Sequence, residues 1–164
     1  MNPHFIFNSL NSIQHYIFNN EQDNANYYLT KFSTLIRDSL EYSKLNLISL
    51  EDEIQFIKNY LELEQMRFTK SFHFDIIINP KITISKIFIP PLILQPIIEN
   101  SIKHGFKNID YKGLIQIQVK FYDQYNFLKI IITDNGNGLF SYSAKQIGNK
   151  TSHGIKIVNS RIKI

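Results

Sequence analysis

The sequence contains no cysteine, which excludes disulfide bonds, thiolate metal sites and a cysteine nucleophile, and which suits a reducing compartment. It also lacks any run of like charges, and its formal net charge is only +4, so nothing indicates a nucleic-acid-binding surface. The most apolar stretch, ITISKIFIPPLILQPII, contains Lys86 and three prolines and does not predict a membrane span. Pro3, His4 and Asn8 interrupt any apolar run of the signal-peptide kind at the start.

What the sequence does contain first is a pair of helical patterns, over residues 3–18 and about 24–45, with Asp23 as a possible cap of the second. The short polar joint FNNEQDNAN predicts that the two helices fold back as an antiparallel hairpin. Such a hairpin buries too little by itself, so we expect it to form half of a dimeric four-helix bundle. The apolar positions that we expect in this core are Ile6, Leu10, Ile13, Ile17, Leu29, Phe32, Ile36 and Leu40.

A polar stripe runs along the other face of the first helix, because at 100° per residue His4, Asn8, Asn11 and His15 fall on one side. The core explains the apolar face, whereas a histidine-bearing polar face suggests a partner or a ligand. The histidines are scattered without the spacing of zinc ligands. We expect His15 and His73 to be structural or exposed.

The second part of the chain mixes helices and strands. Ser49 and the acidic residues after it predict a capped helix that runs to about residue 68. We then expect a strand over 72–78, a turn at Asn79-Pro80 and irregular or extended chain. A helix over 92–104, ended by Gly105, comes next. It is followed by paired strands over 114–121 and 127–133, a polar loop over 134–153 and a short terminal helix. The chain thus divides into two modules, residues 1–47 and 48–164.

The helix LILQPIIENSIKHG is amphipathic, and it carries Glu99, Asn100, Lys103 and His104 on its polar face. An exposed surface helix with a Glu99–Lys103 pair would explain most of this pattern. It would not explain Asn100, since asparagine is a poor helix former. An amide oxygen can ligate Mg²⁺, and a neighbouring lysine can meet a phosphate.

The segment TDNGNG follows an apolar strand, and Asn-Gly is a strong signal for a tight turn. No alternating apolar strand follows it, which favours a second explanation. Asp134 could accept a hydrogen bond from an amino group such as that of adenine, while Gly136 and Gly138 let the backbone approach a ligand closely. Further on, Gly154 opens a helix behind Ser152, and the N–H groups at a helix start can bind an anion.

Five motifs follow one another along the chain in a fixed order: NPHFIFNSLNSI, KFSTLIRDSLEY, YLELEQMRF, PPLILQPIIENSIKHG and DNGNG. The later ones resemble the Bergerat-type ATP-binding domain of histidine kinases. Together with the first, they resemble the LytS-like sensor histidine kinases, a family of two-component sensors. The resemblance extends from Asn2 to about Ile162.

The resemblance implies an α+β protein: the helical hairpin for dimerisation and histidine phosphotransfer, followed by an α/β-sandwich ATP-binding domain. It implies that ATP phosphorylates His4 and that the phosphoryl group passes to an aspartate of a response regulator. The implied nucleotide-binding residues are Asn100, which holds Mg²⁺, Asp134, which recognises adenine, and Lys103, His104, Gly136, Gly138, Ser152 and Gly154.

The sequence departs from the family pattern at three points. Ser152 occupies a position where the family often has the first glycine of Gly-x-Gly. Phe5 follows His4, where many other histidine kinases have an acidic residue, so Glu99 becomes our candidate for a catalytic base. The chain starts within the helix that bears His4 and stops at Ile164, before the final strands of an ATP-binding domain, so we expect a fragment truncated at both ends.

The partners implied are a second copy of the chain and the receiver domain of a response regulator, without nucleic acid. We expect this region to be cytoplasmic and the full-length protein to be anchored in the inner (cytoplasmic) membrane through segments outside it. Two alternatives remain. One is a pseudokinase scaffold that dimerises and binds a regulator without phosphoryl transfer. The other is a Bergerat-type ATPase or serine kinase, against which the NPHF motif at the start of a hairpin argues.

Overall fold

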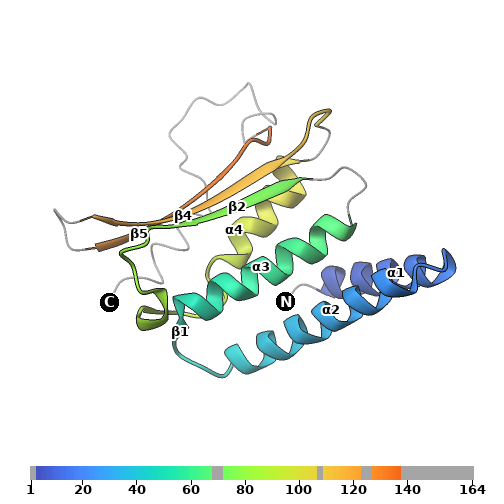
Figure 1. Cartoon of the computed structure of the whole chain (residues 1–164), viewed down its shortest axis with the longest axis horizontal. Coiled ribbons are helices and arrows are strands. Elements are labelled where there is room, and N and C mark those ends of the chain that lie inside the picture. Colours follow the sequence, from blue (N-terminus) through green and yellow to red (C-terminus); the bar gives the residue numbers. More distant parts are fainter. Residues whose placement is uncertain (1–2, 68–71, 107–108, 123–126, 138–164) are drawn as a thin grey trace.

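The structure is a computed structural model of the chain, and it describes residues 3–67, 72–106, 109–122 and 127–137. Figure 1 shows these residues in three layers. A helical hairpin forms the first layer, two helices form the middle layer, and a twisted sheet forms the third. The class is therefore mixed helix and sheet, with the helices first, as the sequence predicts.

The hairpin consists of α1 (Pro3–Phe18) and α2 (Gln22–Tyr42). The bounds of α1 agree with the prediction, whereas α2 begins two residues before position 24 and ends three residues before position 45. The prediction of a cap at Asp23 is wrong, because Asp23 lies inside the first turn of α2. The N-cap is Glu21, which makes no capping hydrogen bond with its side chain.

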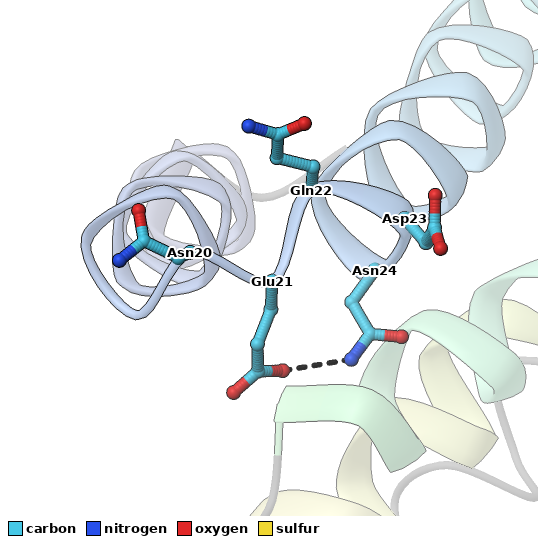
Figure 2. Close-up of a pocket in the computed structure, with 5 residues that line it drawn as sticks. All are labelled: Asn20, Glu21, Gln22, Asp23 and Asn24. Atoms are coloured by element: carbon cyan, nitrogen blue, oxygen red, sulfur yellow. Dashed lines mark hydrogen bonds between the residues drawn. The ribbon is translucent and has the colours of Figure 1, made fainter.

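The joint of the hairpin turns sharply because Asn20 adopts a φ of 58°, a conformation that asparagine tolerates better than most residues. Residues 20–24 line a hollow at this end of the molecule (Figure 2). In it, the Asn24 side-chain amide donates a hydrogen bond of 2.7 Å to a Glu21 carboxylate oxygen. No residue that the sequence predicts as functional lines this hollow.

The buried face of the hairpin is narrower than the apolar pattern suggests. Phe5 and Ile13 are buried on α1, but Leu10 and Ile17 are 45% and 59% exposed. On α2, Phe32 is buried, whereas the expected core residues Leu29 and Leu40 are exposed. These exposed side chains lie outside the core of a single chain, and their burial in the core of a dimeric bundle stays a prediction.

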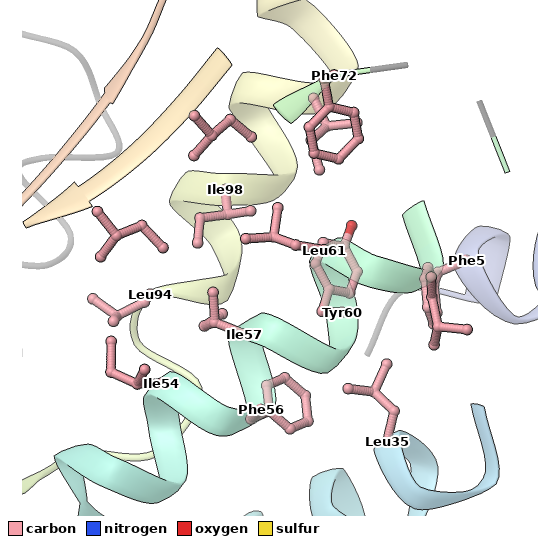
Figure 3. Packing of buried hydrophobic residues seen from close by; sticks show 14 of the residues in the cluster. Phe5, Leu35, Ile54, Phe56, Ile57, Tyr60, Leu61, Phe72, Leu94 and Ile98 are labelled. Atoms are coloured by element: carbon pink, nitrogen blue, oxygen red, sulfur yellow. The ribbon is translucent and has the colours of Figure 1, made fainter. Parts of the chain in front are cut away.

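The middle layer contains α3 (Leu50–Arg67), whose start is capped as predicted. The Ser49 hydroxyl accepts a hydrogen bond of 3.0 Å from the Asp52 N–H and donates one of 2.7 Å to the Asp52 carboxylate. Because α3 lies between the hairpin and the sheet, it buries residues around most of its circumference (Figure 3). Phe56, Ile57, Tyr60, Leu61 and Leu63 each have 1% exposure or less.

The sheet has the order β2-β4-β5, formed by β2 (His73–Ile78), β4 (Leu114–Tyr122) and β5 (Phe127–Asp134). β4 runs antiparallel to β5, which confirms the predicted hairpin. β2 runs parallel to β4, a pairing that the sequence analysis does not predict. Ile115, Ile117 and Val119 on β4 are fully buried. A second, two-stranded sheet pairs β1 (Ile48–Ser49) with β3 (Phe88–Ile89), which follows the short 3₁₀ helix η1 (Ile84–Lys86).

The predicted helix 92–104 begins three residues late, as α4 (Gln95–Asn100), and continues as the π-helical turn η2 (Ser101–Gly105). A buried carboxylate fixes its start. Glu53 on α3 accepts hydrogen bonds of 2.7 Å and 2.9 Å from the N–H groups of Leu92 and Leu94. Leu92 is thereby held at a φ of 57°, which is rare for leucine.

The hairpin and α3 share one hydrophobic cluster, which also includes residues of α4 and the sheet. The Phe5 ring centroid lies 5.1 Å from that of Tyr60 on α3, and the Tyr16 hydroxyl donates a hydrogen bond of 2.9 Å to the Met66 carbonyl. Lys31 on α2 forms an ion pair of 2.7 Å with Glu62 on α3. The first module is thus packed directly against the second in the structure.

Candidate functional site

The polar face of the α4–η2 helix has the predicted composition. Leu94, Ile98 and Ile102 are buried, each with 3% exposure or less. Asn100 and His104 are exposed on the other side. The Lys103 ammonium pairs with Glu99 at 2.8 Å, and the Gln95 amide donates to the same carboxyl group, also at 2.8 Å.

The end of η2 contacts the segment that follows β5 without any side chain between them. A Cβ atom added to Gly136 would lie 2.5 Å from the Cα of Gly105, which no packed structure permits. The Asn137 N–H donates a hydrogen bond of 2.9 Å to the Gly105 carbonyl. Glycine is therefore required here for close approach of two backbones, and Gly105 ends the helix as predicted.

Asp134 is held at this junction by two donors. The Ser101 hydroxyl donates a hydrogen bond of 2.6 Å to Oδ2, and the Gly136 N–H donates one of 3.0 Å to Oδ1. The carboxylate is otherwise exposed to solvent. Each carboxylate oxygen can accept more than one hydrogen bond, so Asp134 keeps acceptor capacity for a ligand.

Asn135 fastens the same segment on its other side. Its side-chain oxygen accepts a hydrogen bond of 2.6 Å from the Leu114 N–H, and its amide donates one of 3.1 Å to the Lys112 carbonyl. The Tyr111 hydroxyl donates to the Asn135 carbonyl at 2.7 Å. The turn after β5 is thus bound both to η2 and to the loop before β4, which makes it a rigid platform.

Sequence reasoning did not select Ser101 or Asn135. Ser101 follows Asn100 and Asn135 follows Asp134, which were both selected from the sequence. This adjacency was the sequence feature that could have pointed to them. Their partners lie 33 and 21 positions away along the chain, and a local pattern carries no information about such contacts.

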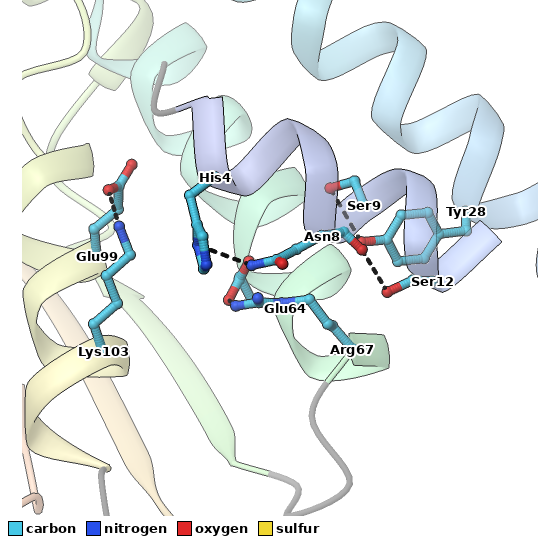
Figure 4. Close-up of polar contacts among 9 residues, drawn as sticks. All are labelled: His4, Asn8, Ser9, Ser12, Tyr28, Glu64, Arg67, Glu99 and Lys103. Atoms are coloured by element: carbon cyan, nitrogen blue, oxygen red, sulfur yellow. Dashed lines mark hydrogen bonds and ion pairs between the residues drawn. The ribbon is translucent and has the colours of Figure 1, made fainter. Parts of the chain in front are cut away.

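His4 lies on the exposed side of the first turn of α1. A hydrogen bond of 3.0 Å joins its Nδ1 to the amide nitrogen of Asn8, one turn further along the polar stripe (Figure 4). Phe5, the next residue, is 3% exposed and packs against Phe32 and Tyr60. The buried Phe5 ring therefore fixes the backbone next to the exposed imidazole of His4.

Buried charges connect the end of α3 with η2. Glu64 is 1% exposed and forms an ion pair with Arg67. Burial raises the pKa of Glu64, while Arg67 and Lys103 act in the opposite direction. Among the residues that the structure describes, Glu64 Oε1 has no hydrogen-bond partner.

The structure brings together some of the predicted residues and leaves others untested. Asp134 and Gly136 meet the end of the helix that carries Asn100, Lys103 and His104. Gly138, Ser152 and Gly154, together with the predicted terminal helix, lie outside the described residues. Glu99 is paired with Lys103, and its role as a base stays a prediction.

The side chains near Asn100 would suit a magnesium ion whose other ligands are mainly waters and phosphate oxygens. Asn100 offers an exposed amide, and within the described part of the chain no group of three His, Cys, Asp or Glu residues could hold a metal ion. Mg²⁺ commonly keeps several waters and binds phosphate oxygens through one or two protein ligands. One exposed amide oxygen, at Asn100, fits that pattern.

Comparison with known proteins gives the same family. Residues 1–72 match the histidine kinase family. The sensor protein LytS of Staphylococcus saprophyticus is 35% identical over 93% of this chain and 25% of its own length. These matches support the resemblance of this chain to the LytS-like histidine kinases. The sensor protein LytS of Streptococcus mutans is 35% identical over 92% of this chain and 25% of its own, and the sensor histidine kinase/phosphatase LytS of Staphylococcus aureus is 33% identical over 85% and 23%.

This LytS-like chain spans about a quarter of the length of the relatives it matches. In the described residues, no helix is both long enough and apolar enough to cross a membrane.

Proposed function

We propose that this chain is the phosphoacceptor and ATP-binding core of a sensor histidine kinase of a two-component system. The observation that carries the proposal is the junction between η2 and the turn after β5, in which Asp134 is fixed by two donors beside a glycine–glycine contact. A junction of this kind presents an oriented carboxylate at the end of a strand, which suits a base bearing an amino group.

In this proposal the residues of the junction bind ATP, within a Bergerat-type fold that comprises residues 48–164. Asp134 accepts a hydrogen bond from the amino group of adenine, and Gly136 keeps the turn packed against Gly105 so that this carboxylate stays in place. Asn100 holds the magnesium ion, which would offset charge on the phosphate oxygens. Lys103 and His104 lie on the same polar face, where they can meet phosphates, and Gly138, Ser152 and Gly154 complete the site.

His4 is the nucleophile. One ring nitrogen attacks the γ-phosphorus, the bond to the bridging oxygen breaks, and ADP leaves with that oxygen. The Asn8 amide nitrogen lies 3.0 Å from Nδ1 and helps to orient the imidazole ring. The phosphoryl group then passes to an aspartate of a response regulator. The rate depends mainly on the positioning of His4 against the nucleotide.

We also propose that the protein acts as a homodimer and that segments outside this chain anchor it in the cytoplasmic membrane. The first proposal is supported by the exposed apolar residues of the hairpin, among them Phe7, Leu10, Ile17 and Leu40. Burial of such side chains is worth about 1.5 to 3 kcal/mol each, and a four-helix bundle would cover them.

The nucleotide site is tested by Asp134→Asn in the full-length protein. The variant replaces one acceptor oxygen by a donor, so we expect its affinity for ATP to fall about tenfold while its weak affinity for GTP changes little. Calorimetric titration with both nucleotides measures this. Equal losses for ATP and GTP would show that Asp134 does not read the base.

A further inference from the structure

Ser101 has a position and a partner that the proposed nucleotide site does not yet use. Its side chain is on the first residue of η2, is 8% exposed and donates a hydrogen bond of 2.6 Å to Asp134 Oδ2. This hydrogen bond joins the Asp134 side chain to the helix that bears Asn100. A buried hydroxyl therefore reaches across from the helix to an exposed carboxylate.

Two acceptors compete for the single hydroxyl proton of Ser101. Serines in helices often donate to the carbonyl four residues earlier, and here the Ile97 carbonyl lies 3.4 Å from the hydroxyl. The Asp134 oxygen is much closer at 2.6 Å, and a hydrogen bond to a carboxylate is stronger than one to a neutral carbonyl. The proton is therefore directed to Asp134.

The consequence for Asp134 is a fixed orientation. The hydrogen bond from the Gly136 N–H to Oδ1 comes from the same turn as Asp134. By itself it would still let the carboxylate rotate about the bond between Cβ and Cγ. The Ser101 hydroxyl supplies a second point of attachment on a different element. Two points on separate elements determine where the remaining lone pairs of the carboxylate are directed.

We propose that Ser101 is a positioning residue for base recognition, and that its hydroxyl holds the Asp134 carboxylate in the orientation that accepts the exocyclic amino group of adenine. This inference rests on the proposed function, in which Asp134 binds the base. Ser101 acts through Asp134, so its effect is confined to nucleotides that carry the amino group.

The test compares two nucleotides on the full-length protein: ATP, and purine riboside triphosphate, which lacks the 6-amino group. In the wild type, ATP binds more tightly than the analogue. Ser101→Ala lowers the affinity for ATP about five- to tenfold and changes the affinity for the analogue by less than about twofold. Ser101→Thr, which keeps a hydroxyl, restores the preference. In an Asp134→Asn background, Ser101→Ala has no further effect.

Ser39→Ala is the matched control, because Ser39 has the same 8% exposure and lies on α2, and it leaves both affinities unchanged. Melting curves of all variants establish that they are folded. Equal losses for the two nucleotides in Ser101→Ala, or no loss for either, would overturn the inference while leaving nucleotide binding intact. A wild type that binds neither nucleotide, or binds both equally well, would instead overturn the proposed function, and this inference with it.

Discussion

At the scale of single residues, buried carboxylates set local geometry in this chain. Glu53 is fully buried and binds the N–H groups of Leu92 and Leu94, which hold the entry to α4. The position of α4 in turn determines where Asn100 and Ser101 stand. Glu53 is therefore connected to the proposed nucleotide site although it lies on another helix.

Glu53→Gln should destabilise the chain by about 1 to 3 kcal/mol, because the amide nitrogen would face one of the two backbone donors. Denaturant unfolding measures this. Glu51→Gln is the matched control, since Glu51 is exposed in the same first turn of α3 and should change stability little. Equal effects of both substitutions would contradict the role of Glu53 at the entry to α4.

The pH dependence of this variant follows from the sign of the shift. Burial raises the pKa of Glu53 above its ordinary value. Between the ordinary and the raised value, the folded protein binds more protons than the unfolded chain. The contribution to stability is therefore full below the ordinary value and is lost as pH rises through the raised one. We expect stability to fall less steeply with rising pH in Glu53→Gln than in the wild type.

Some of the site could be predicted from local sequence, and some could not. The sequence around Asp134 and Gly136 carries its own signal, because a strand followed by Asp-Asn-Gly predicts an exposed carboxylate and a glycine turn. The packing of Gly136 against Gly105 is not part of that signal. The polar face with Asn100 follows from helical periodicity. Ser101 and Asn135 act through partners far along the chain, and only the folded structure shows those contacts.

At the scale of elements, the hairpin is fixed against α3 through the residue that follows His4. Phe5 is inserted between Phe32 and Tyr60. The sequence predicted the hairpin itself, since periodicity and a short polar joint are sufficient. It did not predict which stripe would be buried, because that depends on the packing of α1 against both α2 and α3.

Phe5→Ala should lower the free energy of unfolding by about 3 to 5 kcal/mol, through loss of buried contacts and the cavity that remains. Phe7→Ala provides the control two residues away, since Phe7 is 68% exposed, and it should cost less than about 0.5 kcal/mol. Chemical denaturation of the monomeric chain measures both. Similar costs for the two substitutions would show that Phe5 does not anchor α1.

At the scale of the whole molecule, the three layers place the hairpin that bears His4, the helices of the middle layer and the twisted sheet in one packed unit (Figure 1). The mixed fold class was predictable from the change of period along the chain. The ATP-binding fold and the division into modules at residue 47 stay predictions, because the resemblance rather than the described structure carries them.

Assembly offers a test at this scale. Residues 1–164 alone should dimerise weakly and show little autokinase activity. His4 lies in the first turn of α1, and the terminal turns of a helix fray. A protein extended by several helical turns upstream and by further sequence downstream should form a stable dimer and regain activity. Light scattering and transfer of label from ATP on both proteins decide this. A tight, fully active dimer of residues 1–164 would mean that the module boundaries are wrong.

The most direct test of the central claim is phosphate incorporation at His4 in the full-length protein supplied with γ-labelled ATP and Mg²⁺. The account predicts acid-labile, base-stable label in the wild type, none in His4→Gln, and an undiminished amount in His15→Gln. His15 is a fair control because it forms the same kind of contact, 3.0 Å to Asn19 on the same helix face. Equal labelling of the wild type and His4→Gln would contradict the assignment, and absence of label from a wild type that binds ATP would identify a pseudokinase scaffold.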